Sequence, residues 1–298
     1  MSTEVKKNAL KSCLPPDPNP VKPDWVLPPG ACDAHCHVFG PASIFPYAPD
    51  RSYTPPDAPL EHLRRLHQQL GISRAVIVHA SCHGSTMDVT LNAIAASGAA
   101  YRGVACVEDG VSDAELDRLH AGGIRGIRFN FVKHLGGVPD LGVFYRSIAR
   151  IRPRGWHVVL HFDAEDILTQ QDLLRRIDVP FIIDHMGRVK AADGLEQLPF
   201  RLLLDLYRSN PLAWVKVCGA ERVSAGKRPF RDAVLFARAL IDADPERILW
   251  GTDWPHPNIT KDMPNDGELV NLFAEICPDP KRRHRILVDN PTRLYWAD

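Results

Sequence analysis

The sequence has no excess of charge of either sign and no long apolar run. Lysine and arginine together number 36, and aspartate and glutamate also number 36, so no overall field draws the chain toward nucleic acid or a membrane surface. No uninterrupted apolar stretch approaches the length that crosses a bilayer, and the first residues lack the apolar core of a secretory signal. We therefore expect a cytoplasmic protein that binds neither nucleic acid nor membrane.

The cysteines and glycines do not form the patterns that indicate a disulfide-stabilised protein or a nucleotide-binding protein. The seven cysteines are odd in number and most fall within predicted strands, which indicates reduced thiols and not a disulfide framework. No glycine-rich phosphate-binding motif follows the first predicted strand, which argues against a doubly wound nucleotide-binding sheet.

Proline, in contrast, is concentrated near the start of the chain. Residues 14–30 contain seven prolines, and this density excludes helix and favours an extended arm that lies over the rest of the protein. We expect Trp25 and Val26 to pin the arm to the surface. No comparable linker follows, so the sequence predicts a proline-rich arm over residues 1–30 and a single domain over residues 31–298.

From residue 31 onward, strand patterns alternate with helical patterns. The strand candidates are continuous apolar runs, which are typical of parallel strands covered on both faces. The eight candidates span residues 31–36, 74–80, 102–107, 125–130, 157–162, 180–185, 213–218 and 247–252. Helical patterns lie between them, and residues 267–276 and 281–296 are expected to form closing helices. Eight such units predict an α/β protein with a (β/α)8 TIM barrel fold.

Four histidines and one aspartate stand at the ends of these predicted strands: His35, His37, His161, His185 and Asp253. Alternate residues of a strand face the same side, so His35 and His37 can bind one ion together. Active sites of such barrels lie at the C-terminal ends of the strands, and imidazoles with one carboxylate suit zinc or a similar divalent metal. The five side chains therefore predict a hydrolytic metal site.

Six longer segments carry a family resemblance. They are Asp33–Pro41, Ala80–Gly84, Gly126–Phe131, Gly155–Val159, Ile183–Arg188 and Trp250–Asn258. These segments resemble the amidohydrolase superfamily, and within it the lactonase branch that includes 2-pyrone-4,6-dicarboxylate lactonases and 4-sulfomuconolactone hydrolases. The resemblance covers nearly the whole chain and implies a hydrolase of carboxylic esters that acts in the breakdown of aromatic compounds.

Two positions differ from the pyrone lactonases that the sequence resembles. Those enzymes work without metal and carry a tyrosine at the end of strand five, where this sequence has His161, and His134 replaces an arginine after strand four. His161 completes the histidine set of the superfamily, while Arg128 and Asn130 stand in place of its bridging group on strand four. The resemblance therefore implies one divalent metal, zinc or manganese.

The favoured activity is the metal-dependent opening of 4-sulfomuconolactone to maleylacetate and sulfite. The alternative is a metal-independent 2-pyrone-4,6-dicarboxylate lactonase, followed by a metal-dependent decarboxylase and a sugar-lactone isomerase on the same scaffold. A further alternative is a barrel without catalytic activity that serves as a binding or structural module. Such a protein would have no need for five polar groups at one rim.

Ring opening of a lactone requires water to attack a carbonyl carbon, which a bound metal can support. We expect the four histidines and Asp253 to hold the metal, and Asp253 also to take a proton from water and pass it to the leaving oxygen. His185, the second predicted catalytic residue, could instead orient the substrate. Without metal, Asp253 would remain the general base. Alternation along the strand predicts that Asp184 faces away from His185.

An anionic lactone also needs cationic and hydrogen-bonding partners. Arginine grips carboxylate or sulfonate with paired hydrogen bonds, and three arginines at the rim of an otherwise neutral protein predict a dianionic substrate. The predicted substrate-binding residues are Tyr53, Ser81, His83, Arg128, Arg188, Arg222 and Asn258. Arg188 and Arg222 could also form surface ion pairs. No helix face is plainly left over for a partner subunit, so the oligomeric state stays open.

Overall fold

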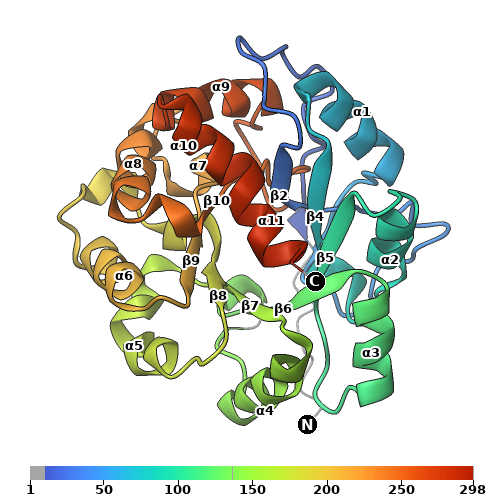
Figure 1. The fold of residues 1–298 in the computed structure, drawn as a ribbon. Coiled ribbons are helices and arrows are strands. Elements are labelled where there is room, and N and C mark those ends of the chain that lie inside the picture. The colour runs from blue at the N-terminus through green and yellow to red at the C-terminus, as the bar shows by residue number, and fades with distance from the viewer. Residues whose placement is uncertain (1–10, 136, 298) are drawn as a thin grey trace, which may run out of the picture.

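A ring of eight parallel strands forms the centre of the molecule (Figure 1). The computed structural model describes residues 11–135 and 137–297. Each strand of the ring pairs with the next one along the chain. The strands are β2 (Cys32–Cys36), β4 (Arg74–Val78), β5 (Tyr101–Ala105), β6 (Ile124–Asn130), β7 (His157–His161), β8 (Phe181–Ile183), β9 (Ala213–Lys216) and β10 (Ile248–Leu249).

The ring is closed by backbone hydrogen bonds between its first strand and the segment after its last one. The N–H of Ala34 donates to the carbonyl of Trp250 at 2.9 Å, and the N–H of Asp253 donates to the carbonyl of His35 at 2.8 Å. Parallel strands that close in this way form a (β/α)8 barrel, so the predicted fold is confirmed. The eight predicted strands are all present, with ends that differ by a few residues.

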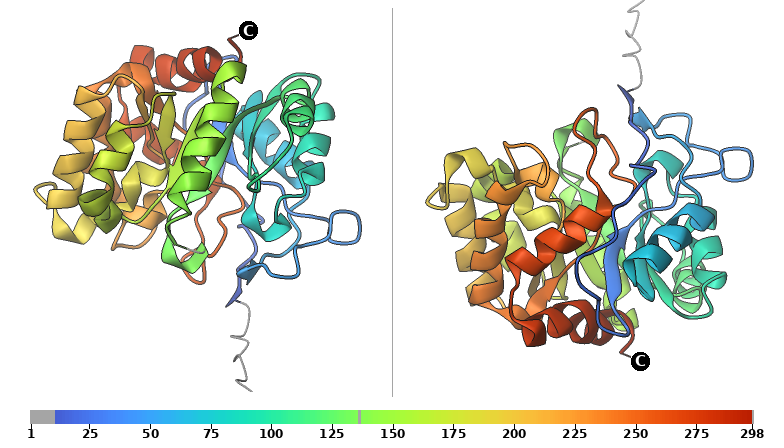
Figure 2. Two further views of the ribbon diagram at one scale, coloured as in Figure 1. Left: turned by 90° about the horizontal axis from the view of Figure 1, so that it is seen from below. Right: turned by 90° about the horizontal axis from the view of Figure 1, so that it is seen from above.

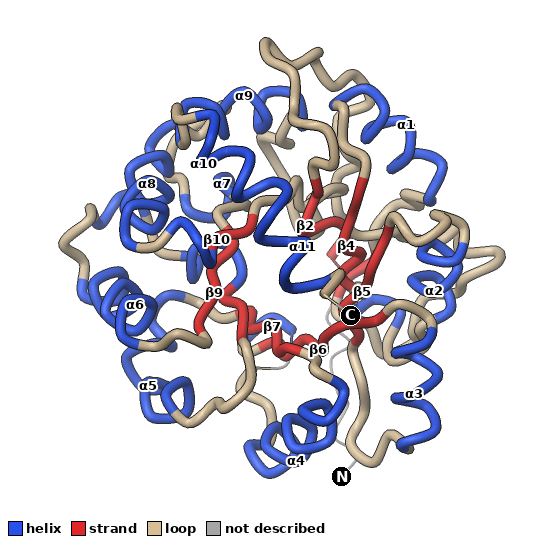
Figure 3. Tube along the Cα trace, in the orientation of Figure 1, coloured by secondary structure: helices blue, strands red, loops and turns tan. Residues whose placement is uncertain are grey.

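Helices form an outer layer around the strands (Figure 3). They are α1 (Leu60–Leu70), α2 (Asp88–Ala95), α3 (Asp113–Ala121), α4 (Leu141–Ile151), α5 (Ile167–Arg175), α6 (Leu198–Ser209), α7 (Ala220–Val223), α8 (Val234–Ala243), α9 (Asp266–Ile276), α10 (Pro280–His284) and α11 (Asn290–Tyr295). Helix α1, for example, buries a stripe of leucines because its apolar residues recur on one helical face. The predicted helix over 281–296 is interrupted, since Arg285–Asp289 form a wider turn between α10 and α11.

Most side chains in the interior of the barrel, below the C-terminal ends of the strands, are apolar. Its buried side chains are Cys32, Ala34, Val76, Val78, Val104, Val159, Ile182, Trp214, Leu249 and Tyr295. Tyr295 belongs to α11, which Figure 1 shows lying across one end of the ring. The polar side chains that could carry out chemistry therefore lie at the opposite end of the barrel, where the strands have their C-terminal ends.

One histidine buried beside Tyr295 makes stability depend on pH. Burial lowers the pKa of His157 to about 3, and among the described residues neither of its ring nitrogens has a hydrogen-bond partner. Below its ordinary pKa of about 6.5 the unfolded chain binds a proton here and the folded chain does not. This contribution to stability is therefore full above about pH 6.5 and falls by about 1.4 kcal/mol per pH unit below it.

The variant His157→Leu should flatten the pH dependence by that amount. Leucine has a similar volume and cannot bind a proton, so the free energy of unfolding should fall less steeply between about pH 6 and pH 4. Urea unfolding at several pH values measures both slopes. Parallel slopes for the wild type and the variant would show that His157 takes no part.

Arginines at the N-terminal ends of the strands satisfy carbonyl groups of the connecting loops. These donors are Arg74, Arg102, Arg125 and Arg247. Buried carbonyls need such partners. This end of the barrel therefore serves stability, while the C-terminal ends are available for chemistry.

Arg247 gives this role a test. Its guanidinium donates to the carbonyls of Asn210 at 2.6 Å, Ala213 at 2.7 Å and Tyr207 at 3.0 Å, and to the carboxylate of Asp244 at 2.7 Å. Arg247→Met should lower the free energy of unfolding by about 2–4 kcal/mol, because those acceptors lose their donors, and should leave the activity of the folded protein unchanged. Arg247→Lys, which keeps the charge but not the fork, should lose part of the same stability. Urea unfolding measures it, and a Met variant as stable as the wild type would contradict the assignment.

The proline-rich segment lies along α9 as an extended arm (Figure 2). Asn265, just before α9, accepts a hydrogen bond from the N–H of Val21 at 2.9 Å, and the indole of Trp25 donates to a carbonyl of α9 at 3.0 Å. Gly267 makes room for the crossing, because a Cβ there would lie 1.8 Å from the carbonyl oxygen of Val21. Trp25 thus pins the arm as expected, whereas Val26 is 90% exposed and pins nothing.

The arm also reaches the C-terminal end of the barrel. Its strand β1 (Lys11–Ser12) pairs with β3 (Tyr53–Thr54) in the loop after β2, and the N–H of Leu14 donates to the carbonyl of Ile259 in the loop after β10. The division of the chain at residue 30 stays a prediction. In the described part of the chain, no helix is long and apolar enough to cross a membrane.

Candidate active site

A bulge in β2 sets the positions of the first two histidines. Asp33 pairs with Ala75 and Cys36 pairs with Ile77, so one extra residue of β2 lies opposite β4. Cys36 consequently packs in the outer layer between strands and helices. The rings of His35 and His37 lie together, with their centroids 5.1 Å apart, as their predicted shared face requires.

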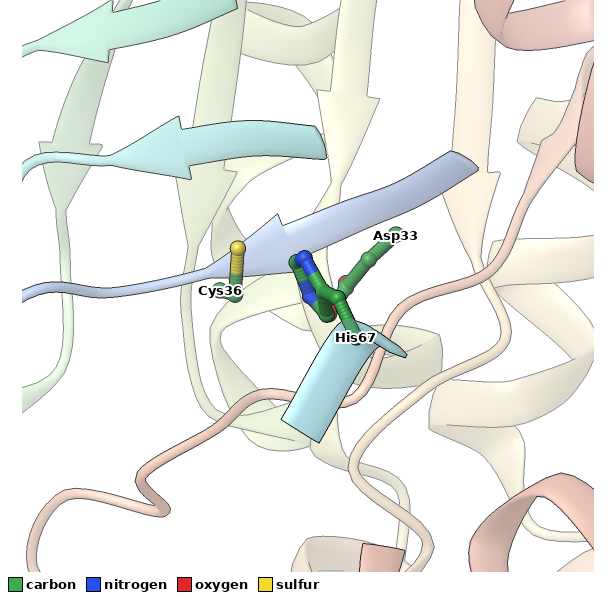
Figure 4. A group of neighbouring side chains, drawn as sticks. All are labelled: Asp33, Cys36 and His67. Atoms are coloured by element: carbon green, nitrogen blue, oxygen red, sulfur yellow. The ribbon is translucent and has the colours of Figure 1, made fainter. Parts of the chain in front are cut away.

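The carboxylate of Asp33 holds this bulge in place. It accepts hydrogen bonds from the N–H of His35 at 3.1 Å, from the N–H and hydroxyl of Thr252 at 3.0 and 2.6 Å, and from His67 at 3.2 Å. Figure 4 shows Asp33 and His67 beside Cys36, a trio that could in principle offer ligand atoms to a metal. Both oxygens of Asp33 already have donors, however. We call Asp33, His67 and Thr252 the clasp, because they join β2 to the segment after β10.

His35, His37 and Asp253 form the centre of the site. Each offers one ligand atom, and these atoms lie within 4.8 Å of one another. The carbonyl of Val78 lies 2.7 Å from Nδ1 of His37, so Nε2 of His37 faces Oδ1 of Asp253 at 3.3 Å. Nε2 of His35 lies 3.5 Å from the same oxygen and has no hydrogen-bond partner among the described residues. Two imidazole nitrogens and a carboxylate oxygen that face one point suit a divalent metal.

His185 reaches the site through a left-handed turn. Strand β8 ends at Ile183, and residues 185–188 all have positive φ values, of 51°, 54°, 64° and 50°. Each non-glycine residue in this region costs roughly 1–2 kcal/mol, so the surrounding packing must hold the turn. The ring of His185 packs against Gly219, where a Cβ would lie 2.5 Å from Nδ1. The ring centroid of His185 lies 4.8 Å from the ring centroid of His35.

The predicted orientation of Asp184 is wrong. Asp184 faces the barrel interior, where Oδ1 lies 3.3 Å from Nδ1 of His35 and Oδ2 lies 3.1 Å from the guanidinium of Arg128. Strand alternation places Asp184 inside together with Ile182, and the left-handed turn then brings His185 inside as well. Adjacent residues therefore serve the same site.

Lys216, the last residue of β9, is a site residue that the sequence analysis missed. Its side chain is fully buried, and Nζ lies 3.2 Å from Oδ1 of Asp184 and 3.0 Å from Nδ1 of His35. The signal was a lysine inside the otherwise apolar run Ala213–Cys218. A lysine is almost never fully buried unless it is paired, so such a residue in a barrel strand indicates an interior charge.

His161 is the last residue of β7. His185 lies between His161 and His35 of the centre. The ring centroid of His161 is 5.5 Å from that of His185, and Nδ1 of His161 is 3.1 Å from the side-chain oxygen of Asn130. Among the residues that the structure describes, its nitrogens belong to no group of converging ligand atoms. Its role as a metal ligand stays a prediction.

The three predicted arginines each pair with a carboxylate. Arg128 and Arg222 are largely buried, whereas Arg188 is 21% exposed and so is open to an incoming ligand. The pairs are Arg222 with Asp253 at 2.8 Å, Arg128 with Asp184 at 3.1 Å and Arg188 with Asp163 at 2.8 Å.

The remaining predicted substrate-binding residues lie on the loops around this centre. Tyr53 is buried, with its hydroxyl beside Ser81. The ring of His83 faces the loop after β2, with Nδ1 3.2 Å from the carbonyl of Pro46. Asn258 donates its N–H to a thiol of the arm at 3.3 Å. Their roles in binding stay predictions.

Comparison with known proteins assigns the chain to a family. The family model described as amidohydrolase matches residues 32–296. The chain belongs to the amidohydrolase family. A 2-pyrone-4,6-dicarboxylate hydrolase of Comamonas testosteroni is 43% identical over 94% of both chains, and a 4-sulfomuconolactone hydrolase of Rhizobium radiobacter is 42% identical over 96% of both. A solved structure from Acinetobacter baumannii, provisionally assigned as a 2-pyrone-4,6-dicarboxylic acid hydrolase and containing citric acid, has a TM-score of 0.78 and 25% identity over 90% of this chain and 99% of its own.

Burial and neighbouring charges set the protonation of the centre in this amidohydrolase. Burial alone would raise the pKa of Asp253, but Arg222, His185 and a hydrogen bond from His37 hold that pKa well below its ordinary value. Burial lowers the pKa of His185 to about 4 and lowers the pKa of His35 well below its ordinary value. At neutral pH Asp253 is therefore a carboxylate, and His35 and His185 are neutral imidazoles, which are the forms that bind a metal.

Proposed function

We propose that this amidohydrolase is a metal-dependent lactone hydrolase of aromatic-compound catabolism. The observation that carries the proposal is the convergence of His35, His37 and Asp253 on one buried point. The names of the two curated relatives support the reaction class, because 2-pyrone-4,6-dicarboxylate and 4-sulfomuconolactone are both cyclic esters with acidic groups. Hydrolysis of such an ester is a reaction on a carboxylic ester bond.

The converging donor atoms suit one divalent cation, zinc or manganese. His35, His37 and Asp253 would hold it, with His185 and His161 as further ligands. The unpartnered Nε2 of His35 supports this assignment, because a buried polar atom is rarely left without a partner. When bound, the cation would polarise the lactone carbonyl and make water more acidic.

Asp253 is placed to handle the protons of the reaction. Arg222 donates to Oδ2 of Asp253 at 2.8 Å, which leaves Oδ1 directed toward His35 and His37. A carboxylate held in this way can accept a proton from the attacking water and return it to the leaving oxygen. If His185 does not bind the metal, its neutral imidazole can instead orient the lactone carbonyl.

The rim favours an anionic substrate through Arg188. Its partner Asp163 is 37% exposed, and an exposed ion pair contributes little, so a substrate anion can replace Asp163 at low cost. Arg128 and Arg222 are held by buried carboxylates and orient the centre. The citric acid in the related Acinetobacter baumannii structure supports a pocket for acidic ligands. Within this class we favour 4-sulfomuconolactone, because His161 ends β7, at the position where the resemblance implies a tyrosine in pyrone lactonases.

One observation favours a metal-independent 2-pyrone-4,6-dicarboxylate lactonase as the second candidate. Lys216 lies against His35 and Arg222 lies against Asp253, and both positive charges oppose a cation at the same point. In that case Asp253 would act as general base, and the histidines would polarise the carbonyl.

We also infer a cytoplasmic location. The seven cysteines are free, and free thiols are typical of the reducing cytoplasm. The substrate is a small anion, and the balanced charge of the chain gives no attraction to nucleic acid.

Elemental analysis, paired with hydrolysis assays, tests the proposal. We expect about one equivalent of zinc or manganese per chain, and hydrolysis of 4-sulfomuconolactone that is lost on chelation and restored by the metal. His37→Gln should lose metal and activity together. Metal-free protein that opens the pyrone dicarboxylate would overturn the proposal in favour of the second candidate. Release of carbon dioxide would indicate a decarboxylase, and a product of unchanged mass an isomerase.

A further inference from the structure

Lys216 shares one nitrogen of His35 with Asp184. Nδ1 of His35 lies 3.0 Å from Nζ of Lys216 and 3.3 Å from Oδ1 of Asp184. Lys216 itself lies 3.2 Å from the same oxygen of Asp184. The three groups form a buried triangle behind His35, and the side chains of Lys216 and Asp184 are both fully buried.

This triangle permits two arrangements of the single proton of a neutral imidazole. In the first, Nδ1 of His35 accepts a hydrogen bond from Lys216, so the proton is on Nε2 and faces Oδ1 of Asp253, 3.5 Å away. In the second, Nδ1 carries the proton and donates it to Asp184, so Nε2 presents a lone pair. Only the second arrangement allows His35 to bind a metal through Nε2, and it matches the carboxylate–histidine–metal arrangement that orients metal-binding histidines.

The geometry points to Lys216 as a positioning residue that selects between these arrangements and so lowers the metal affinity of the centre. This inference rests on the proposed metal site. A lysine ammonium has three N–H donors and no acceptor, so at 3.0 Å from Nδ1 it can only donate to that nitrogen. Metal binding must then break this hydrogen bond and move the imidazole proton to Nδ1.

Arg128 offers a matched comparison for the charge of Lys216. Arg128 also neutralises Asp184, at 3.1 Å from Oδ2, but no contact joins it to His35 in the described structure. Lys216→Met and Arg128→Met therefore each remove one positive charge beside Asp184 and leave it another cation. Only the first variant removes the donor to Nδ1 of His35, so a difference between them isolates the hydrogen bond from the charge.

Zinc titration of metal-stripped protein against a chromophoric chelator gives the affinity without an activity assay. We expect Lys216→Met to bind zinc about 10–100-fold more tightly than the wild type, the range by which such outer partners change metal affinity, and Arg128→Met to change it several-fold less. Thermal unfolding of both variants measures whether the barrel remains folded, and we expect a cooperative transition for each. The ¹⁵N spectrum of histidine-labelled, metal-free protein, with the signals of His35 identified by His35→Gln, reports the tautomer directly. It should show Nε2 protonated in the wild type and Nδ1 protonated in Lys216→Met.

The outcomes separate this inference from the proposed function. Zinc affinity in Lys216→Met that is equal to or weaker than that of the wild type would overturn the inference, even if the wild type is a zinc enzyme. Equal tightening in both variants would also overturn it, because charge alone would then explain the effect. Zinc binding by Lys216→Met but not by the wild type would support the inference and overturn the metal dependence of the wild type. A failure of both to bind zinc would overturn both.

Discussion

Asp253→Asn is expected to lower kcat for lactone hydrolysis by about 10³-fold, with a much smaller change in KM. Proton transfer by a positioned carboxylate contributes about 10²–10⁴-fold to a rate, and an amide cannot accept the proton of the attacking water. Asparagine has the size of aspartate, so its oxygen can still accept a hydrogen bond from Arg222. The loss should therefore appear in kcat, and steady-state kinetics on the lactone measures it.

Asp163→Asn serves as the control for this variant. Asp163 pairs with Arg188 at the half-exposed rim and is placed to handle no proton in the reaction. Removing its charge frees Arg188 for the substrate, so KM should fall or stay constant while kcat changes by less than about tenfold. If Asp253→Asn kept more than about a tenth of kcat, Asp253 would not be the general base.

A large loss of stability is expected from Gly251→Ala in the seam of the barrel, where β2 meets the segment after β10. A Cβ at Gly251 would lie 2.5 Å from the backbone nitrogen of His35 and 2.7 Å from Oδ1 of Asp33. Neither atom can move without breaking the clasp or the bulge. Overpacking costs about 1–3 kcal/mol, and the rigid backbone and carboxylate around Gly251 place the expected loss at about 3 kcal/mol, the upper end of that range. Activity should fall together with stability, because His35 must shift to admit the methyl group.

Gly226→Ala is the matched control, since the nearest atom to a Cβ there is 3.4 Å away. Urea unfolding should show wild-type stability for Gly226→Ala and a lower midpoint for Gly251→Ala. Metal content of the purified variants gives a second measurement, because a displaced His35 should also weaken metal binding. Equal stability of the two variants would show that β2 and the segment after β10 can move apart to admit the methyl group without a loss in the free energy of unfolding.

The barrel could be predicted from the sequence because its signals are local and repeated. Each strand is a short apolar run that must be covered on both faces, and eight such runs between helical patterns leave few architectures. The centre followed from the barrel, since active sites in barrels of this kind lie at the C-terminal ends of the strands. His35, His37 and Asp253 needed only that rule.

The rest of the site depends on geometry that strand alternation does not carry. Asp184 and His185 both face the interior because the backbone turns left-handed after Ile183. Gly187 is the only residue of this turn whose type indicates a left-handed conformation. The pairing of Arg222 with Asp253 joins residues from different loops, so sequence spacing gives no hint of it. Lys216 was visible as a charge in an apolar strand, but its partners were not.

The closure of the barrel has a consequence for the synthesis of the chain. His37 and Asp253 are 216 residues apart, and at about 5–20 residues per second a ribosome needs roughly 10 to 40 seconds to cover that distance. During this time the first strand has emerged with its histidines and has no last strand to meet. The candidate site therefore cannot assemble until the segment after the last strand has been made, and a nascent chain that stops before that strand carries most of the barrel with His35 and His37 but lacks Asp253.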